Sequence, residues 1–466
     1  MNRQLSKFSI QGLLGEFDHT IRISNDQDII ILYGPNGVGK THVLKFIHHA
    51  LRGEWMQIQE LSFATAALHF TDGTKLLFSF ELSQTNLHSD SPRRRASIAE
   101  SNPPLLVKLI TNEGEMEWQA PSVDFSDTSP MLLRRLIERD LGYRRIDTDV
   151  YAKTNSDERF TFTQAIAEES RAISRILSNR YLDSSTDLSL GLPDRMNKFV
   201  NSSASTMIET QRLIMSTPLS QTPRDRTAQT LLAIDQVSKS IQTLMEQALA
   251  DNSRLSQRLD RTFPGRLFES ETTEKYVEID IRRIHLEQQE FRARLAEYQL
   301  GGVDESNVEL PQRPLETWEI AVLGRYLRDS DQKLSSFKDL LERLDLFIQT
   351  LNSRFFRKTI RFSSDRSLEI TSKSGVSLEV SQLSSGEQHE IILLKYLLFD
   401  ANQNSLVLID EPEISLHVSW QKAFLSDLSK ISMVSNLRFI IATHSPQIIN
   451  NAWDLAVQLG GNSDEW

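Results

Sequence analysis

The chain has 466 residues, no cysteine and a formal net charge of −11, with 39% hydrophobic and 25% charged residues. This composition is typical of a globular protein, and the absence of cysteine excludes disulfides, thiolate metal sites and cysteine nucleophiles. No apolar run approaches the roughly 18 residues needed to span a bilayer, and the first residues lack the apolar core of a signal peptide. We therefore expect a cytoplasmic protein without membrane partners. Its acidic total argues against a generally basic nucleic-acid binder.

The N-terminal part predicts strands that lead into a loop and a helix. Residues 8–10 and 21–23 alternate apolar and polar side chains at the period of a strand. Residues 29–33 form a continuous apolar run, which is typical of a strand buried on both faces. A helix is expected over residues 43–49.

A hairpin and a polar stretch follow. The segments 61–70 and 74–80 flank Asp72-Gly73, which predicts a β-hairpin because glycine accepts a positive φ in the turn. The polar stretch carries Arg93, Arg94 and Arg95, and it is either a solvated loop or a local basic patch.

The middle of the chain predicts helices. Apolar side chains recur in steps of three and four within residues 234–248 and 277–298, with Gln288 as the polar member of the second series. Phe263-Pro264-Gly265 lies between the two series and should end a helix. A short antiparallel helical hairpin near 224–300 fits this pattern, and so do ordinary amphipathic helices packed on a core.

Strands and helices alternate again near the C-terminus. Strands are predicted at 360–362, 368–370, 376–380, 405–409 and 438–442, with helices at 386–399 and 420–431. Alternation at both ends of the chain implies an α/β fold with a largely parallel sheet covered by helices. We therefore divide the chain into an N-terminal half-domain over 1–125, a helical insertion over 126–355 and a C-terminal half-domain over 356–466.

A phosphate-binding loop is the strongest motif. Residues 34–41 match G-x-x-x-x-G-K-[ST] between a buried strand and a helix. Glycines let backbone N–H groups wrap phosphates, and the following helix turns its positive end toward them. Lys40 is expected to reach the β- and γ-phosphates of ATP, and Thr41 to ligate Mg²⁺. The predicted ATP-binding residues are Gly34, Pro35, Asn36, Gly37, Val38, Gly39, Lys40 and Thr41.

Two further strands end in polar groups. The apolar strand 406–409 is followed by Asp410 and Glu411, at a strand tip of the kind where open α/β sheets bind ligands. Asp410 suits a Mg²⁺ ligand, and Glu411 suits the catalytic base that polarises the attacking water. The strand 440–442 precedes His444, which we expect one strand away and near the γ-phosphate. A surface acidic pair and a structural histidine are the alternatives, which the phosphate loop disfavours.

A second anion-binding helix start is predicted after Leu383. Ser384, Ser385, Gly386, Glu387 and Gln388 stand directly before a helix, where serine and glycine leave backbone N–H groups for an anion. The same spacing is typical of an ordinary N-cap with a nearby glutamate, and both interpretations stay open.

These four motifs, in this order, resemble those of the ABC ATPase superfamily: Walker A, signature, Walker B and histidine switch. The resemblance implies a head-to-head homodimer in which Ser384 and Gly386 of one copy meet the γ-phosphate held by Lys40 of the other. His444 would sense that phosphate. Dimers of dimers or a hexamer would be further assemblies.

The spacing narrows the resemblance. Lys40 and Ser384 are 344 residues apart, which resembles the heads of chromosome-maintenance and repair ATPases rather than transporters. The segments around Asp410 and His444 resemble overcoming-lysogenization-defect ATPases and, within that group, the ATPase subunit of Septu-type antiphage systems. Residues 208–213 also resemble a recurring element of that group.

This resemblance implies an HNH nuclease partner, with DNA contacted through the complex. Only 22 residues follow His444, so we expect no toprim nuclease in the chain itself. A DNA-maintenance ATPase that binds DNA directly is the alternative, whereas a transporter motor is disfavoured by the long insertion.

The chain departs from the transporter pattern in three respects. His417 stands where an aspartate is usual. No lid glutamine is evident, with Gln57 and Gln59 the nearest candidates, and no adenine-stacking aromatic is evident, although Phe17 or His19 could serve.

Overall fold

The computed structural model describes residues 3–24, 26–80, 104–120, 130–147, 150–153, 159–162, 193–209, 223–268, 277–301, 309–379, 382–414, 416 and 418–460. Residues 93–95, most of 208–213 and His417 lie outside this part of the chain. The fold has two compact units. The first unit comprises Met1–Gln27, Tyr33–Ser205 and Val457–Trp466, and the second comprises Asp28–Leu32 and Thr206–Ala456. Each is described by itself.

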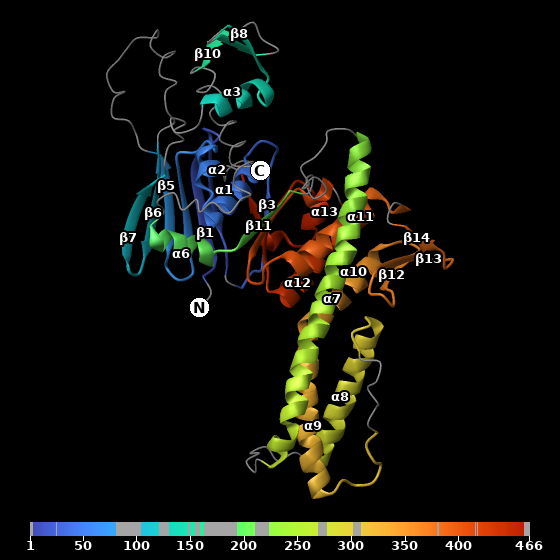
Figure 1. Ribbon diagram of the computed structural model, residues 1–466. Coiled ribbons are helices and arrows are strands. Elements are labelled where there is room, and N and C mark those ends of the chain that lie inside the picture. The colour runs from blue at the N-terminus through green and yellow to red at the C-terminus, as the bar shows by residue number, and fades with distance from the viewer. Residues whose placement is uncertain are drawn as a thin grey trace. The chain divides into compact units, whose positions relative to one another are not determined.

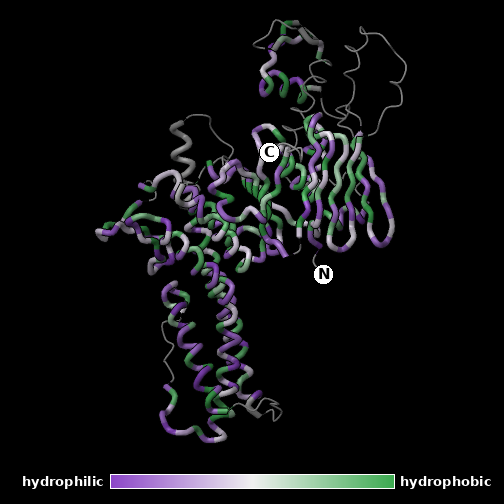
Figure 2. The backbone as a smooth tube through the Cα atoms, turned by 180° about the vertical axis from the view of Figure 1, so that it is seen from behind, coloured by the Kyte–Doolittle hydropathy of each residue, from purple (hydrophilic) through white to green (hydrophobic). Residues whose placement is uncertain are grey.

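The first unit contains a six-stranded antiparallel sheet with strand order β2-β1-β4-β5-β6-β7. Burial alternates along β4, where Ala66, Leu68 and Phe70 are buried, because successive side chains of a strand point to opposite faces. Figure 2 shows hydrophobic and hydrophilic residues interspersed along this sheet. The hairpin at Asp72-Gly73 is confirmed, since Gly73 has φ +83° and Thr74 donates its N–H to Asp72 Oδ1 at 3.0 Å. The strands are β1 (Leu5–Leu13), β2 (Phe17–Arg22), β4 (Thr65–Phe70), β5 (Lys75–Phe80), β6 (Leu105–Thr111) and β7 (Gly114–Gln119).

An aromatic core joins this sheet to helix α1 (Lys40–Arg52). The Phe46 ring on α1 is fully buried and lies 5.0–5.6 Å, centroid to centroid, from the rings of Phe8, Phe63 and Phe78. Such edge and tilted contacts fix the helix on the sheet. Helices α2 (Trp55–Gln59) and α6 (Asp194–Ser202) pack against α1.

A small module within residues 130–162 differs from the expected helical insertion. It contains α3 (Pro130–Arg139) and a three-stranded sheet of β8 (Tyr143–Asp147), β9 (Val150–Lys153) and β10 (Arg159–Thr161). These strands have three to five residues, too few to display a period in the sequence. The buried side chains are Leu133, Leu136, Ile137, Tyr143 and Tyr151.

The second sheet has strand order β11-β15-β16-β3-β17. Strands β15 and β16 run parallel, with Asp410 opposite Ala442, and β3 is buried along most of its length, as its apolar run predicts. The predicted α/β fold is confirmed, and β15 and β16 form the expected parallel pair, whereas the separate six-stranded sheet of the first unit is antiparallel. The strands are β3 (Ile29–Tyr33), β11 (Ser205–Glu209), β15 (Leu406–Asp410), β16 (Arg438–Thr443) and β17 (Ala456–Gln458).

The second unit also contains several shorter elements. A three-stranded antiparallel sheet has the order β12-β13-β14, and helix α11 continues into a π-helical turn, η4. The elements are β12 (Lys358–Phe362), β13 (Leu368–Ser372), β14 (Ser377–Leu378), α11 (Ser385–Lys395), η4 (Tyr396–Asp400), η5 (Pro412–Ile414), α12 (Val418–Ser435), α13 (Pro446–Ile449) and η6 (Trp453–Leu455).

Long helices form the rest of the second unit (Figure 1). Helix α9 (Thr317–Ser335) packs against both α7 (Pro223–Phe268) and α8 (Glu278–Glu297), and α10 (Lys338–Arg354) follows it. The predicted two-helix hairpin is not seen as such, because α8 packs mainly against α9, and α7 packs against α9 and α11 (Ser385–Lys395). Gln288, the polar member of the predicted seam, is buried and donates to the carbonyl of Leu327 at 2.8 Å.

Helix α7 does not end before Pro264, contrary to the prediction. Proline removes one backbone hydrogen bond, but here it stands four residues from the helix end, and the turn beyond it is anchored. Arg266 binds both carboxylate oxygens of Asp329 on α9, at 2.5 and 2.6 Å, and the Leu259 carbonyl at 2.8 Å. Tertiary contacts thus hold a turn that the local sequence disfavours.

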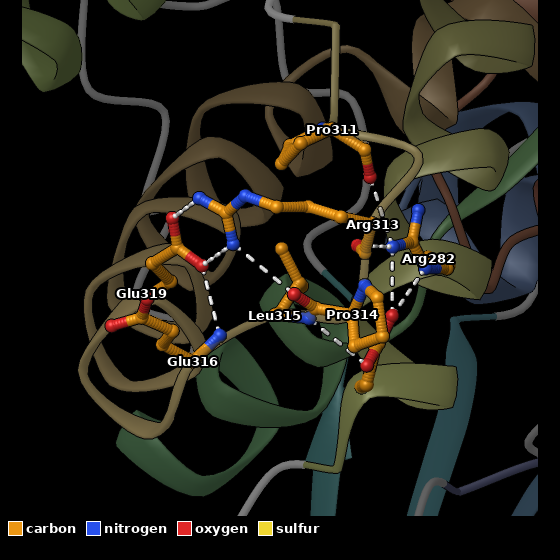
Figure 3. Close-up of polar contacts among 8 residues, drawn as sticks. Arg282, Pro311, Arg313, Pro314, Leu315, Glu316 and Glu319 are labelled. Atoms are coloured by element: carbon orange, nitrogen blue, oxygen red, sulfur yellow. Dashed lines mark hydrogen bonds and ion pairs between the residues drawn. The ribbon is translucent and has the colours of Figure 1, made fainter.

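The chain that enters α9 is pinned by two arginines (Figure 3). Arg282 on α8 donates to the carbonyls of Pro311 and Arg313 at 3.0 and 2.9 Å, and Arg313 forms a two-pronged ion pair with Glu319 at 2.6 and 2.8 Å. The Glu319 carboxylate also accepts the Glu316 N–H, which completes a capping box.

Among the described residues, no helix combines the length and apolar composition required to cross a membrane.

Candidate active site

The predicted phosphate loop lies in the first unit, between the end of β3 and the start of α1. Gly37 and Gly39 have φ of +88° and +90°, a conformation that side chains other than glycine rarely adopt. Lys40 is buried, and its Nζ donates to the carbonyls of Gly34 and Pro35 at 2.9 Å each. The loop therefore holds its lysine close to its own backbone, at the start of a 13-residue helix.

The C-terminal segment closes against this loop. The N–H of Leu459 donates to the Tyr33 carbonyl at 2.8 Å. A Cβ at Gly34 would lie 2.3 Å from the Leu459 carbonyl oxygen, and a Cβ at Gly460 would lie 2.6 Å from Val38. Gly34 is thus required by close approach of the Leu459 backbone, and Gly460 by the Val38 side chain and its own φ of +78°.

His19 holds the loop from another side. Its Nε2 lies 2.8 Å from the carbonyl oxygen of Val38, the imidazole is only 4% exposed, and the Phe17 ring stacks on it at 6.0 Å. The buried ring of His19 does not offer a face to adenine, contrary to one of the two sequence candidates. Gln57 and Gln59 lie on α2, and their role as a lid remains a prediction.

In the second unit, the structure brings Glu411 and His444 together at the ends of neighbouring parallel strands. Asp410 is the last residue of β15, and the N–H of Glu411 donates to the Ala442 carbonyl of β16 at 2.9 Å. His444 Nε2 lies 3.6 Å from Glu411 Oε1, with 30% and 31% of the two side chains exposed. Glu411 has φ +48°, an uncommon conformation that is held where these strands end.

Sequence reasoning assigned no role to Glu413, which lies in η5. Its carboxylate accepts the Thr443 hydroxyl at 2.8 Å and the His444 N–H at 2.7 Å. The partners are 30 and 31 residues away in the chain, so no local pattern signals the contact.

The predicted signature residues begin α11. Ser384 is its N-cap, and the Glu387 carboxylate accepts the Ser384 N–H at 2.8 Å and the Ser384 hydroxyl at 3.0 Å. The capping-box interpretation is therefore confirmed, while contact of Ser384, Ser385 and Gly386 with a second copy stays a prediction. Gln388 donates to the Leu383 carbonyl at 3.2 Å.

Lys358 on β12 is a second residue that the sequence did not reveal. Its Nζ lies 2.8 and 2.7 Å from the two carboxylate oxygens of Glu387. Burial alone would raise the pKa of Glu387, but the hydrogen bonds from Lys358 and Ser384 outweigh it and hold the pKa below its usual range. Glu387 is thus an ionised anchor that keeps the signature loop in place.

A protein-family model matches most of this chain. The family described as "AAA domain, putative AbiEii toxin, Type IV TA system" matches residues 29–450, a span that includes the phosphate loop, Ser384, Glu411 and His444. The chain belongs to this AAA-domain family. It is an ATPase of the ABC type, as the motifs predicted, and the family implies a bound nucleotide.

Individual relatives match over short stretches. The chain is 40% identical over 90 residues to "Retron Ec83 probable ATPase" of Escherichia coli, covering 17% of this chain and 16% of that protein. It is 40% identical over 68 residues to "Protein ea59" of Escherichia phage lambda, covering 15% and 13%. The chain thus matches less than a fifth of either relative's length.

Two solved structures align along most of the chain. One is the Smc head domain of Pyrococcus furiosus with an extended coiled coil bound to the C-terminal domain of ScpA, and the other is an SmcHead bound to the C-winged helix domain of ScpA. Sequence identities are 12% and 11%, TM-scores are 0.33 and 0.32, and each alignment covers 96% of this chain and 92% of the other. Scores at this level carry no conclusion about activity.

The residues of this AAA-domain ATPase suit the chemistry that its family requires. Glycines with positive φ and a helix start provide backbone N–H groups for phosphate. Thr41 and Asp410 each carry an oxygen of the kind that Mg²⁺ prefers, and their joint role in one Mg²⁺ site stays a prediction. Glu411, with a third of its side chain exposed, is accessible to water.

Proposed function

We propose that this ATPase is a subunit of a bacterial antiphage defence complex in which its ATP cycle regulates a partner nuclease, of HNH type as in Septu-type systems. The 40% identity over 90 residues to "Retron Ec83 probable ATPase" carries the proposal. The family description, which names a putative toxin of a toxin–antitoxin system, supports it. The resemblance of the segments around Asp410 and His444 to defence ATPases points the same way.

The proposed cycle uses two copies of the chain. Lys40 and the loop N–H groups bind the phosphates of ATP, Thr41 and Asp410 hold Mg²⁺, and Ser384 of the other copy contacts the γ-phosphate. Glu411 then accepts a proton from the attacking water while His444 donates a hydrogen bond to the γ-phosphate. Loss of this phosphate removes contacts that favour the closed dimer, and the dimer opens.

The test is expression of the chain with its neighbouring open reading frames, followed by purification and mass determination. A stable complex with a nuclease-like subunit, whose DNA cleavage changes on addition of ATP, is the expected result. Glu411→Gln in the same complex should bind ATP, lower hydrolysis by about 10²- to 10⁴-fold, and fix the nuclease in one state.

Two results would contradict the proposal. A dimer that copurifies with no nuclease, and that binds DNA in an ATP- and salt-dependent way, would instead support the DNA-maintenance function. Degradation of DNA by the purified chain alone, with divalent metal, would place the nuclease in this chain.

A further inference from the structure

Glu413, the third acid of the Asp410-Glu411-Pro412-Glu413 segment, holds the chain where β16 ends through both of its carboxylate oxygens. One carboxylate oxygen accepts the N–H of His444 at 2.7 Å, and the other accepts the hydroxyl of Thr443 at 2.8 Å. Both donors lie where β16 ends. Hydrogen bonds to a charged acceptor are about twice as strong as neutral ones, so this carboxylate fixes the backbone from which the imidazole of His444 extends.

A second ring of contacts locks the same loop. Gln421 on α12 is buried, donates to the carbonyls of Glu413 and Leu416 at 3.1 and 3.2 Å, and accepts the hydroxyl of Ser445 at 2.9 Å. The N–H of Ser445 in turn donates to the Thr443 hydroxyl at 3.0 Å. Backbone and side-chain atoms of η5, α12 and the histidine loop therefore form one closed network.

This network bears on the distance between His444 and Glu411. Their side chains lie 3.6 Å apart, and neither is held by burial, because about a third of each is exposed. Glu413 anchors the backbone from which this imidazole extends beside the predicted catalytic base.

We infer that Glu413 is the positioning residue for His444, and that it acts on ATP hydrolysis only through His444. Both carboxylate oxygens of Glu413 accept a hydrogen bond from the end of β16, so this carboxylate is directed at the backbone of the histidine loop. The inference rests on the ATPase reaction and not on a nuclease partner. Absence of such a partner would refute the proposed function and leave this inference standing.

The experiment compares Glu413→Ala and Glu413→Gln in the full chain, with any copurified partner retained. Glu413→Ala should lower kcat by about 10- to 100-fold with KM and ATP affinity within twofold, because a misplaced catalytic group costs rate rather than binding. Glu413→Gln should recover most of the rate, since its amide oxygen still accepts the His444 N–H. Glu369→Gln on β13, at a carboxylate paired with Arg361, is the matched control and should leave kcat unchanged.

A double-mutant cycle separates positioning from an independent role. In a His444→Ala background, Glu413→Ala should cause less than a twofold further loss of kcat. Full additivity of the two losses, or a Glu413→Gln variant as impaired as Glu413→Ala, would overturn the inference. If thermal unfolding shows that Glu413→Ala is not folded, Thr443→Val replaces it. Thr443→Val should lower kcat less than Glu413→Ala would, and this loss should be absent in the His444→Ala background. A loss that persists in that background would also overturn the inference.

Discussion

Two glutamates of the second unit hold two loops of the candidate active site through the same kinds of hydrogen bond. Glu387 accepts an N–H and a hydroxyl from Ser384, and Glu413 accepts an N–H from His444 and a hydroxyl from Thr443. The first contact spans three residues, whereas the second spans 30 and 31. A carboxylate can thus anchor a loop by hydrogen bonds to residues nearby in the sequence, as Glu387 does, or to residues that strand pairing brings close, as Glu413 does.

The two anchors also differ in charge balance. Glu387 is paired with Lys358, whereas the contacts of Glu413 come from neutral donors. Because of this ion pair, the stability of the predicted signature loop depends on the ionisation of Glu387 and on Lys358. The histidine loop depends instead on the register of β15 against β16.

Glu390, one turn beyond Glu387 on α11, is a buried carboxyl without a lysine partner among the causes of its pKa shift, and it offers the largest expected contrast with Glu387. Burial, and next the neighbouring Asp427, raise its pKa to about 7, although Arg354 opposes the shift. Because this folded-state pKa exceeds the usual 4.5, the protonated carboxyl contributes to the free energy of unfolding in full below pH 4.5. This contribution is lost as the pH rises through the folded-state pKa of about 7 and the buried group ionises. Glu390→Gln should therefore raise the free energy of unfolding at pH 8 by about 3 kcal/mol. Denaturant titration at pH 5 and pH 8 measures this.

The comparison at pH 5 supplies the control for Glu390→Gln. There the wild-type carboxyl is mostly protonated and resembles the amide, so the two proteins should differ little. Equal stabilisation at both pH values would show that ionisation of Glu390 is not the cause.

Removal of the cation from Glu387 should have the next largest effect. Lys358→Met leaves a mostly buried carboxylate without its partner and should lower the free energy of unfolding at pH 7 by about 2 kcal/mol. The pKa of Glu387 is lowered in the folded state, so the ion pair contributes above pH 4.5 and is lost as the pH falls through the lowered pKa. The difference between variant and wild type should therefore shrink on acidification, in contrast to Glu390→Gln. Lys373→Met, in the β13–β14 turn, should change nothing at either pH.

The smallest expected effects compare the hydroxyls of the two loops. Ser384→Ala removes the N-cap of α11 and should cost about 1 kcal/mol of stability. Ser445→Ala removes one link to Gln421 and should cost about 0.5–1 kcal/mol. If Ser384 also contacts ATP on a second copy, Ser384→Ala should lower ATPase activity far more than its stability loss explains. If the loss of ATPase activity is no larger than the loss of stability explains in both variants, Ser384 has only the capping role.

Much of the candidate site could be predicted because its patterns are local. The phosphate loop is one continuous segment in which glycines with positive φ precede a helix, so the pattern and the geometry coincide. The capping box at Ser384 is likewise visible as a four-residue spacing. The apolar runs of β3, β15 and β16 reveal buried strands for the same reason.

Other features could not be predicted because their causes lie far apart in the chain. Lys358 and Glu387 are 29 residues apart, and Arg266 of α7 meets Asp329 of α9 across 63 residues. That second contact stabilises a turn beyond Pro264, where local preference predicts the end of a helix. The role of His19 could not be predicted either, because its contact with the Val38 carbonyl of the phosphate loop spans 19 residues of the chain.

The sequence alone determined that this chain has a nucleotide loop, an acidic strand end, a capped helix start and a histidine after a second strand, since each is fixed by neighbours within a few residues. Only the tertiary structure decided which groups hold them: Glu413 on His444, Lys358 on Glu387, and Leu459 against Gly34. The physical reason is that a hydrogen bond depends on distance in space, and strand pairing and helix packing set that distance between residues that no local pattern connects.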